Sequence, residues 1–330
     1  MNARLLVPLV LIAALGGGNA APADELVLVA GGGTARDGGP AAAAAIGQPF
    51  GLGHDRDGNL FVADFSEHRV WRIDPKGTIS VAAGTGKKGF AGDGGPAAQG
   101  QFDGLHDLVV APNGDIYVAD TYNVRVRKID AKTGILSTVA GNGQKKIAGD
   151  GGPGDQASLD GVASLWLAGD KLYMTGFSAA VRVLDLTTGT IDRVKGLNGA
   201  RTVAVDAKGN VYVCSKALRV LRPDGKVEVL HDPTKAAADE VKLVDVKHLG
   251  FDAEGNVLIA DNFANQVKKY LIADRKLVVV AGSGSKGTGG LNGPPLEAEL
   301  TGPHAVYFHR ATGAVYIGDS RNKRVLKINP

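Results

Sequence analysis

The chain has 330 residues, of which 44% are hydrophobic, so it is long enough to bury a large core. Glycine accounts for 48 residues, about twice its usual share of ~7%, which indicates a chain rich in turns. Thirty-seven Lys and Arg against 34 Asp and Glu give a formal charge of +3, and this excess is too small to indicate a nucleic-acid partner by bulk charge.

Residues 1–21 have the composition of an export signal. Positive charge precedes the short apolar stretch LLVPLVLIAAL, and small residues lead to candidate cleavage sites after Ala20 and Ala21. The apolar stretch is shorter than the ~20 residues of a membrane-spanning helix, and no later stretch is long enough. We therefore expect a periplasmic or secreted protein that has no membrane span once the signal is removed.

Six copies of one pattern follow in the rest of the chain. Each copy has a turn of the Gly-Asn or Gly-Asp kind and two apolar stretches that alternate with polar residues, as in NGDIYVADTYNVRVRKID. The copies occupy residues 57–74, 113–130, 169–185, 208–224, 254–270 and 312–329. The residues that end the first apolar stretch, here called the marker residues, are Asp64, Asp120, Gly176, Ser215, Asp261 and Asp319. Their spacing of 39 to 58 residues suits the four-stranded blades of a propeller, with strands a to d in each.

The two ends of the chain are predicted to share a blade. The last copy stops at Pro330, directly after its third strand. Residues 25–31, ELVLVAG, are similar to the fourth strand of another copy, ILSTVAG at 135–141. Pairing this first strand with the last blade removes two exposed sheet edges. We therefore predict an all-β fold, a six-bladed β-propeller of four-stranded antiparallel blades, formed by residues 25–330 as one domain and closed by strand 25–31.

A few local signals complete the expected fold. Only DPTKAAADEVKL at 232–243 could form a short helix. Cys214 lies inside a predicted strand, where a small buried thiol is expected. The repeated AGDGGP at 91–96 and 148–153 lacks the closely spaced oxygen ligands of a calcium loop and favours a structural turn. Four histidines fall on turns or loops and are expected to be exposed: His54, His68, His231 and His309.

The pattern VAGxG…GDGGPA…DGNLFVAD…HRVWRID resembles the NHL repeat, and the resemblance covers essentially the whole chain after the signal. It implies a six-bladed propeller with a ligand-binding face around a central channel. Proteins of this kind serve as protein-binding modules, as RNA-binding modules and, in a few branches, as enzymes, so the resemblance indicates the fold more than the function.

One position of the repeat is predicted to line the channel mouth. Aligning the six entrances of strand a gives Phe50, His106, Ala163, Arg201, Lys247 and His304. Lysines on the long glycine-rich loops, which enter blades 1, 2, 3 and 6 and are expected to wall one side of the mouth, add positive charge. We therefore expect the mouth to attract an anionic ligand. The candidate ligand-binding residues are Phe50, His106, Asp107, Arg201, Lys247 and His304.

Two of these positions also suggest a metal site. His106 in LHDLVV and His304 in PHAVYF resemble the Pro-His entrances of peptidyl-hydroxyglycine amidating lyase, an NHL-type propeller that holds zinc in its channel with three histidines. Phe50 stands where that pattern has its third histidine, and His248 is the remaining candidate. The resemblance therefore implies zinc or calcium as a candidate cofactor, with His106, His304 and His248 as ligands.

Two classes of function remain open. The first is a recognition module whose basic mouth binds a protein, a peptide or an anionic cell-envelope ligand such as a glycan. The alternative is a metal-assisted lyase or hydrolase that acts through His106 and His304, with Arg201 or Lys247 stabilising negative charge. No nucleic acid is expected as a partner, because an exported protein rarely meets RNA and no aromatic platform accompanies the lysines in the sequence. Whether the protein is an enzyme is left open by the sequence.

Overall fold

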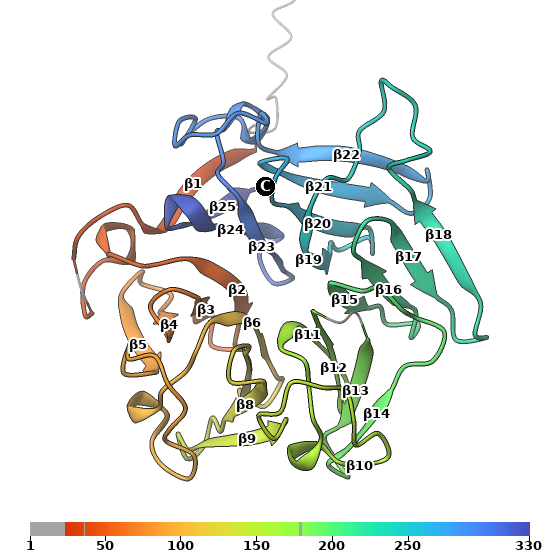
Figure 1. Ribbon diagram of the computed structural model, residues 1–330. Helices are drawn as coiled ribbons and strands as arrows, with labels where there is room; N and C mark the ends of the chain where they lie inside the picture. The colour runs from red at the N-terminus through yellow and green to blue at the C-terminus, as the bar shows by residue number, and fades with distance from the viewer. Residues whose placement is uncertain (1–23, 36, 178–179) are drawn as a thin grey trace, which may run out of the picture.

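The structure, a computed structural model, describes residues 24–35, 37–177 and 180–330, so the predicted export signal lies outside the described residues. The strands of these residues form six antiparallel sheets arranged in a ring around a central channel (Figure 1). Helical structure within the described ranges is limited to five 3₁₀ turns of three residues each. None of the helices among these residues is long and apolar enough to cross a membrane. The prediction of an all-β, six-bladed propeller is confirmed.

In each blade, strand a is innermost and the following strands lie successively further from the channel (Figure 1). Blade 1 contains β2 (Pro49–His54), β3 (Leu60–Asp64), β4 (Arg69–Ile73) and β5 (Ile79–Ala83). Blade 2 contains β6 (Leu105–Val110), β7 (Ile116–Asp120), β8 (Arg125–Ile129) and β9 (Leu136–Ala140). Blade 3 contains β11 (Val162–Ala168), β12 (Lys171–Gly176), β13 (Val181–Asp185) and β14 (Thr190–Arg193), with the short β10 (Gly152–Pro153) outside β14. Blade 4 contains β15 (Thr202–Val205), β16 (Val211–Cys214), β17 (Leu218–Leu221) and β18 (Val227–His231). Blade 5 contains β19 (Val246–Phe251), β20 (Val257–Asp261), β21 (Gln266–Leu271) and β22 (Lys276–Ala281). Blade 6 contains β23 (Pro303–His309), β24 (Ala314–Asp319), β25 (Arg324–Asn329) and, as its outermost strand, β1 (Glu25–Gly31).

The ring is closed by the first and last strands. β1 pairs antiparallel with β25, with Leu26 opposite Ile328 and Leu28 opposite Leu326, so the two ends of the colour scale meet in one blade in Figure 1. Leu26 is fully buried in a cluster with Leu300 and Leu326. The predicted closing strand, residues 25–31, has the same bounds as β1, and the closure is confirmed.

The hydrophobic core lies between neighbouring blades. One cluster, for example, joins Ala119 and Val126 of blade 2 to Leu165 and Leu172 of blade 3. Strands that are covered on both faces are apolar along most of their length, as in the fully buried β7 and β20. Cys214 is also fully buried, and burial raises the pKa of its thiol, which confirms the expected inert role.

The glycine-rich loops cover the outer edges of four blades. Gly94 donates a backbone hydrogen bond of 2.8 Å to Leu136 in β9 of blade 2, and Gly151 donates one of the same length to Ile191 in β14 of blade 3. Both glycines have a φ of +81°, in the left-handed region that favours glycine. These turns therefore have the structural role expected of them, because their loops cover strand edges that would otherwise be open.

Residues 232–243 form turns, so the expectation of a short helix there is wrong. The Asp232 carboxylate accepts hydrogen bonds from the backbone N–H and the hydroxyl of Thr234, at 3.0 and 2.7 Å. Such side-chain bonds compete with the helical hydrogen-bond pattern, and a segment this short is not stable as an isolated helix. Leu243, at its end, is buried against blade 5.

Candidate functional site at the channel mouth

β-Bulges at the start of strand a place one side chain per blade at the channel mouth. The pairing of strand a with strand b shifts register at this point in five blades. The bulged positions include Phe50, His106, Ala163, Lys247 and His304. Arg201 occupies the matching place in blade 4, directly before β15. Because a bulge bends the strand and redirects a side chain, equivalent sequence positions become one ring in space.

The marker aspartates hold the loops that lead into this ring. Asp120 Oδ1 accepts a hydrogen bond of 2.8 Å from the backbone N–H of Asp103, three residues before His106. Asp261 and Asp319 accept the same kind of bond, at 2.7 Å, from Asp245 and Thr301. The aspartates therefore set the positions of the mouth residues, and Asp120 and Asp319 also fix the turns that follow them by accepting hydrogen bonds from Asn123 and Asn322.

A buried partner from strand c neutralises most of these carboxylates. The Arg127 guanidinium lies 3.1 Å from Asp120 Oδ2, and neither side chain is exposed. The corresponding pairs are Lys268 with Asp261, Arg324 with Asp319 and, through a neutral indole N–H, Trp71 with Asp64. A buried charge is tolerated only when it is paired in this way, so the anchors are structural.

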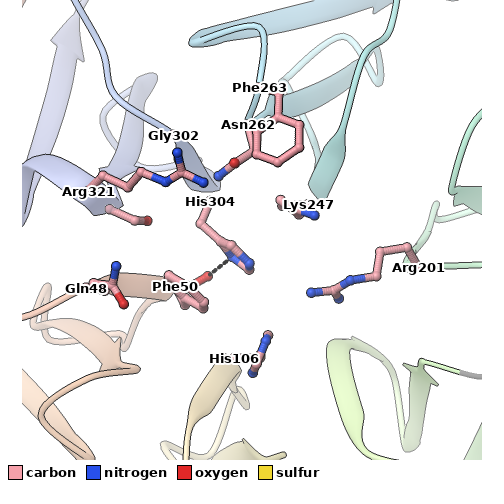
Figure 2. Close-up of a pocket in the computed structure, with 11 residues that line it drawn as sticks. Gln48, Phe50, His106, Arg201, Lys247, Asn262, Phe263, Gly302, His304 and Arg321 are labelled. Atoms are coloured by element: carbon pink, nitrogen blue, oxygen red, sulfur yellow. Dashed lines mark hydrogen bonds between the residues drawn. The ribbon is translucent and has the colours of Figure 1, made fainter. Parts of the chain in front are cut away.

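The ring opens into a pocket of about 260 Å³ at one end of the channel (Figure 2). The pocket is lined by Gln48, Phe50, His106, Arg201, Lys247, Asn262, Phe263, Gly302, His304, Ser320 and Arg321. Figure 2 shows the Arg201 side chain reaching toward His106 and His304, with Arg321 on the opposite side of the pocket. A volume near the lower end of the range for small-molecule sites fits a small ligand or one end of a larger one.

Aromatic rings form one wall of this pocket. Phe50 stacks on His304 with ring centroids 3.7 Å apart and an interplanar angle of 5°, and His106 meets Phe50 edge-on at 5.3 Å. The Nδ1 atoms of His106 and His304 each lie 3.3 Å from a backbone carbonyl oxygen, of Gly104 and Phe50 respectively. Because a carbonyl only accepts, each Nδ1 carries the hydrogen, and each Nε2 remains an acceptor.

Both mouth histidines are neutral at pH 7. Burial, helped by the positive charge of Arg201, lowers the pKa of His106 to about 3. Burial also lowers the pKa of His304 well below its usual value, and Arg201 and His106 act in the same direction. The two imidazoles therefore present fixed hydrogen-bond acceptors over the physiological pH range.

Three cations give the pocket its charge, and none of the described residues that line it is acidic. Arg201 donates one hydrogen bond of 3.2 Å to the Ala163 carbonyl oxygen and packs over Phe177. Lys247 Nζ lies 2.8 Å from Asp245 Oδ1, while Arg321 packs over Phe263. Since a guanidinium has five N–H donors, Arg201 keeps donors for a ligand after bonding to Ala163.

Five of the six predicted ligand-binding residues line the pocket, namely Phe50, His106, Arg201, Lys247 and His304. The structure places Asp107 elsewhere. Its Oδ1 and Oδ2 accept hydrogen bonds of 2.8 Å from the backbone N–H groups of Leu108 and Leu165, so it ties blade 2 to blade 3 below the mouth. Neighbours in a strand point in different directions, which is why adjacency to His106 does not bring Asp107 into the pocket.

The three candidate metal ligands lie in two places. His106 and His304 share the mouth, with ring centroids 5.8 Å apart, whereas His248 Nε2 lies 3.4 Å from Asp107 Oδ1. Within the part of the chain that the structure describes, no group of three or more His, Cys, Asp or Glu side chains could hold a metal ion. Two histidines at the mouth are fewer than the three protein ligands usual for catalytic zinc.

Several mouth residues were missed because they come from the loops after strand b. Asn262 and Phe263 directly follow Asp261, and Ser320 and Arg321 directly follow Asp319. In four copies an aromatic residue stands one or two positions after the marker: Phe65, Tyr122, Phe177 and Phe263. Phe65, Tyr122 and Phe177 all have rings within 6.0 Å of His106. The repeat therefore also contains an aromatic position, which lies beside the cations and which the predicted set of mouth residues did not include.

Acid is expected to destabilise the protein through its buried histidines. The pKa values of His54 and His106 are lowered to about 3, mainly by burial, whereas an unfolded histidine titrates near 6.5. Below pH 6.5 the unfolded chain binds protons that the folded chain does not, so each histidine lowers the free energy of unfolding by up to about 1.4 kcal/mol per pH unit down to about pH 3. Urea unfolding between pH 7 and 5 measures this slope. His106→Gln should reduce it by close to one proton, and an unchanged slope would contradict the assignment.

The chain resembles known proteins both in sequence and in structure. Residues 102–129, which lead into and form much of blade 2, match the family model of the NHL repeat. The chain is 37% identical over 92 residues to a Caenorhabditis elegans protein named "Probable peptidyl-alpha-hydroxyglycine alpha-amidating lyase", which covers 28% of this chain and 25% of that protein. The chain spans about a quarter or less of the length of the curated relatives it matches.

Solved structures resemble the whole ring. A protein of unknown function from Bacteroides thetaiotaomicron superposes with a TM-score of 0.71 at 16% identity, over 93% of this chain and 76% of that one. An auxiliary nutrient binding protein from Bacteroides ovatus gives a TM-score of 0.69 at 14% identity, over 93% and 77%. Identities this low show the fold alone. The chain is therefore a six-bladed β-propeller that carries the NHL repeat, with distant similarity to peptidyl-hydroxyglycine amidating lyase.

Proposed function

We propose that the protein is an exported binding module and that its mouth pocket takes a small anionic ligand. The observation that carries this proposal is the convergence of Arg201, Lys247 and Arg321 on a pocket of about 260 Å³ whose described lining has no carboxylate. The nutrient-binding protein of the same fold supports a binding role. The predicted signal at residues 1–21 supports a location in the periplasm or outside the cell.

The hydrogen-bonding groups of the pocket narrow the ligand class. Guanidinium groups such as those of Arg201 and Arg321 favour a carboxylate or phosphate. The Nε2 acceptors of His106 and His304 need donors, and hydroxyl groups supply them without the positive charge that the cations would repel. The Phe50 ring is stacked both on Phe65, with centroids 4.5 Å apart, and on His304, so it contributes an apolar edge to the wall. A hydroxylated acid, such as the uronic acid unit of an acidic cell-envelope glycan, satisfies the first two requirements.

Removing one guanidinium should weaken this binding strongly. We expect Arg201→Ala to raise the dissociation constant for D-galacturonate by about 10- to 100-fold, which corresponds to the ~1.5–3 kcal/mol of a hydrogen bond to a charged group. Titration calorimetry of the mature protein measures the change. Because the mouth imidazoles do not titrate near neutrality, the affinity should not increase between pH 8 and pH 6.

Two controls make this experiment specific. Arg193→Ala removes an exposed guanidinium from the outermost strand of blade 3 and should leave the affinity unchanged. D-Galactose, which lacks the carboxylate, should bind more weakly than D-galacturonate. Equal affinities for the two sugars, or equal losses in the two arginine variants, would overturn the proposed function.

The alternative, a metal-assisted lyase or hydrolase, is favoured by one specific observation. His106 and His304 are neutral imidazoles with Nε2 free of the carbonyl contacts made by Nδ1, and neutral imidazole is the form that ligates metals. The similarity to the amidating lyase over 92 residues points the same way. Zinc titration separates the alternatives: tight binding of one equivalent, lost in His106→Ala and His304→Ala, supports the enzyme, and failure to bind zinc favours the binding module.

A further inference from the structure

The other end of the channel holds a second and larger cavity. It has a volume of about 930 Å³ and is lined by the later residues of strand a from all six blades, together with the turns that follow. No described residue lines both this cavity and the mouth pocket. Its volume lies within the range of small-molecule sites, whereas packed interiors rarely leave voids much larger than a water molecule.

Glycine occupies the same wall position of this cavity in two blades. Gly53 pairs with Phe61, and Gly250 pairs with Leu258. Each partner stands three positions before the marker residue of its blade. The same position is filled by larger residues elsewhere: Val109 in blade 2, Trp166 in blade 3 and Tyr307 in blade 6. Gly53, Gly250, Val109, Trp166 and Tyr307 all line the cavity. A Cβ at Gly53 would contact the Val110 and Leu108 side chains at 3.1 and 3.2 Å, so only Gly250 has open space beside it.

One ring nitrogen of a buried histidine in the cavity wall lacks a hydrogen-bond partner. His248 is only 8% exposed, and its Nε2 faces Asp107 Oδ1 at 3.4 Å. Both Asp107 oxygens already accept backbone hydrogen bonds, so the carboxylate faces His248 as an acceptor and the ring hydrogen belongs on Nε2. Nδ1 of His248 is buried and has no partner among the described residues. An unsatisfied group of this kind costs about 1–3 kcal/mol, and because solvent does not reach Nδ1, this nitrogen does not face the cavity space.

The charges around the cavity do not select an ion. Three acidic and three basic residues line it: Asp55, Asp206, Glu254, Lys208, Arg222 and Arg310. His54 and His309, which stack at 4.2 Å, are uncharged at pH 7 because burial lowers the pKa of each, that of His54 to about 3. The cavity therefore contrasts with the mouth, where the cations are not balanced by acidic lining residues.

We propose that this cavity is a second binding site, for an uncharged and mainly apolar small molecule. The apolar walls supply the affinity. The site is independent of the anion site, because the two pockets share no lining residue. The polar contacts of Asp107, which join blade 2 to blade 3, lie where the two pockets adjoin.

N-Phenyl-1-naphthylamine, an uncharged aromatic amine with one N–H, is the probe that tests this proposal. We expect saturable binding of one molecule per mature chain, with a rise in probe fluorescence and quenching of Trp166 in the cavity wall. 1-Anilinonaphthalene-8-sulfonate has the same rings with an added negative charge and should bind this site no more tightly than the amine, because the three acidic lining residues balance the three basic ones. That comparison is made in Arg201→Ala, which removes a cation of the mouth pocket.

Filling the cavity should remove the probe. A Cβ added at Gly250 meets only the Val306 carbonyl oxygen, at 3.4 Å, and the φ of Gly250 lies outside the left-handed region, so the backbone accepts a side chain at this position and Gly250→Leu is the first variant to test. We expect it to weaken binding of the amine at least about tenfold. Val109→Phe fills the same position in blade 2 and decides the matter if Gly250→Leu does not fold. Unsaturable binding of the amine to the wild type would overturn the proposal, and so would wild-type affinity for the amine in the folded cavity variants. Unchanged affinity for the amine in Arg201→Ala supports it.

Discussion

A chain that begins at residue 32 is expected to lose its cooperative unfolding transition. Without β1, the backbone groups of β25 form an open edge, and the buried Leu326 and Ile328 lose the cover of Leu26. Each buried leucine contributes about 1.5–3 kcal/mol, and several such losses approach the ~5–15 kcal/mol that stabilises a typical domain. Circular dichroism during urea unfolding measures the transition.

The control for this truncation is a chain that begins at residue 24 and keeps β1. It should unfold at the midpoint of the mature protein. Point variants make the same test without shortening the chain: Leu26→Asp places a charge at a fully buried position and should cost more than about 3 kcal/mol, whereas Glu25→Lys changes an exposed neighbour and should cost less than about 0.5 kcal/mol. Equal midpoints for the chains beginning at 24 and 32 would show that β1 does not close the ring.

Loss of one marker carboxylate is expected to have the next largest effect. Asp120→Ala leaves the fully buried Arg127 without one of its two carboxylate partners and removes the acceptor of the Asp103 N–H. Breaking a buried ion pair by removing one partner costs about 3–5 kcal/mol, so the free energy of unfolding should fall by that amount. The affinity for D-galacturonate should fall too, because Asp103 leads directly into His106.

Two further variants distinguish the buried pair from a general charge effect. Asp224→Ala removes an exposed turn carboxylate that lies near Lys226 and should cost less than about 0.5 kcal/mol. The double variant Asp120→Asn with Arg127→Met removes both charges and should recover part of the stability lost in Asp120→Ala. A loss in Asp120→Ala no greater than in Asp224→Ala would contradict the anchoring role of the marker residues.

The blades and their closure could be predicted because both signals are local. Each repeat carries its own turn and alternating strands, and residues 25–31 have the pattern of the strand that the last copy lacks. Alignment of strand entrances also found the residues on the channel mouth, since the same bulge recurs in blade after blade. Because the copies repeat, aligning them along the sequence was enough to predict which residues lie together in space.

Depth along the channel could not be predicted in this way. Asp107 and His248 are each one residue beyond a mouth position, yet their side chains meet below the mouth. His54 and His309, expected on exposed turns, stack on each other beside the far cavity. The lining of that cavity depends on which residues occupy the same position of strand a in each blade. Glycine at two of these positions indicates a cavity only once the pairing of strand a with strand b is known.

The proposed anion site is tested most directly by a crystal structure of the mature protein grown with D-galacturonate at a concentration that saturates binding in solution. We predict ligand density in the mouth pocket, with the carboxylate within hydrogen-bond distance of Arg201 or Arg321 and a hydroxyl near Nε2 of His106 or His304. An empty mouth pocket under these conditions, or a ligand bound only at another place on the propeller, would contradict it.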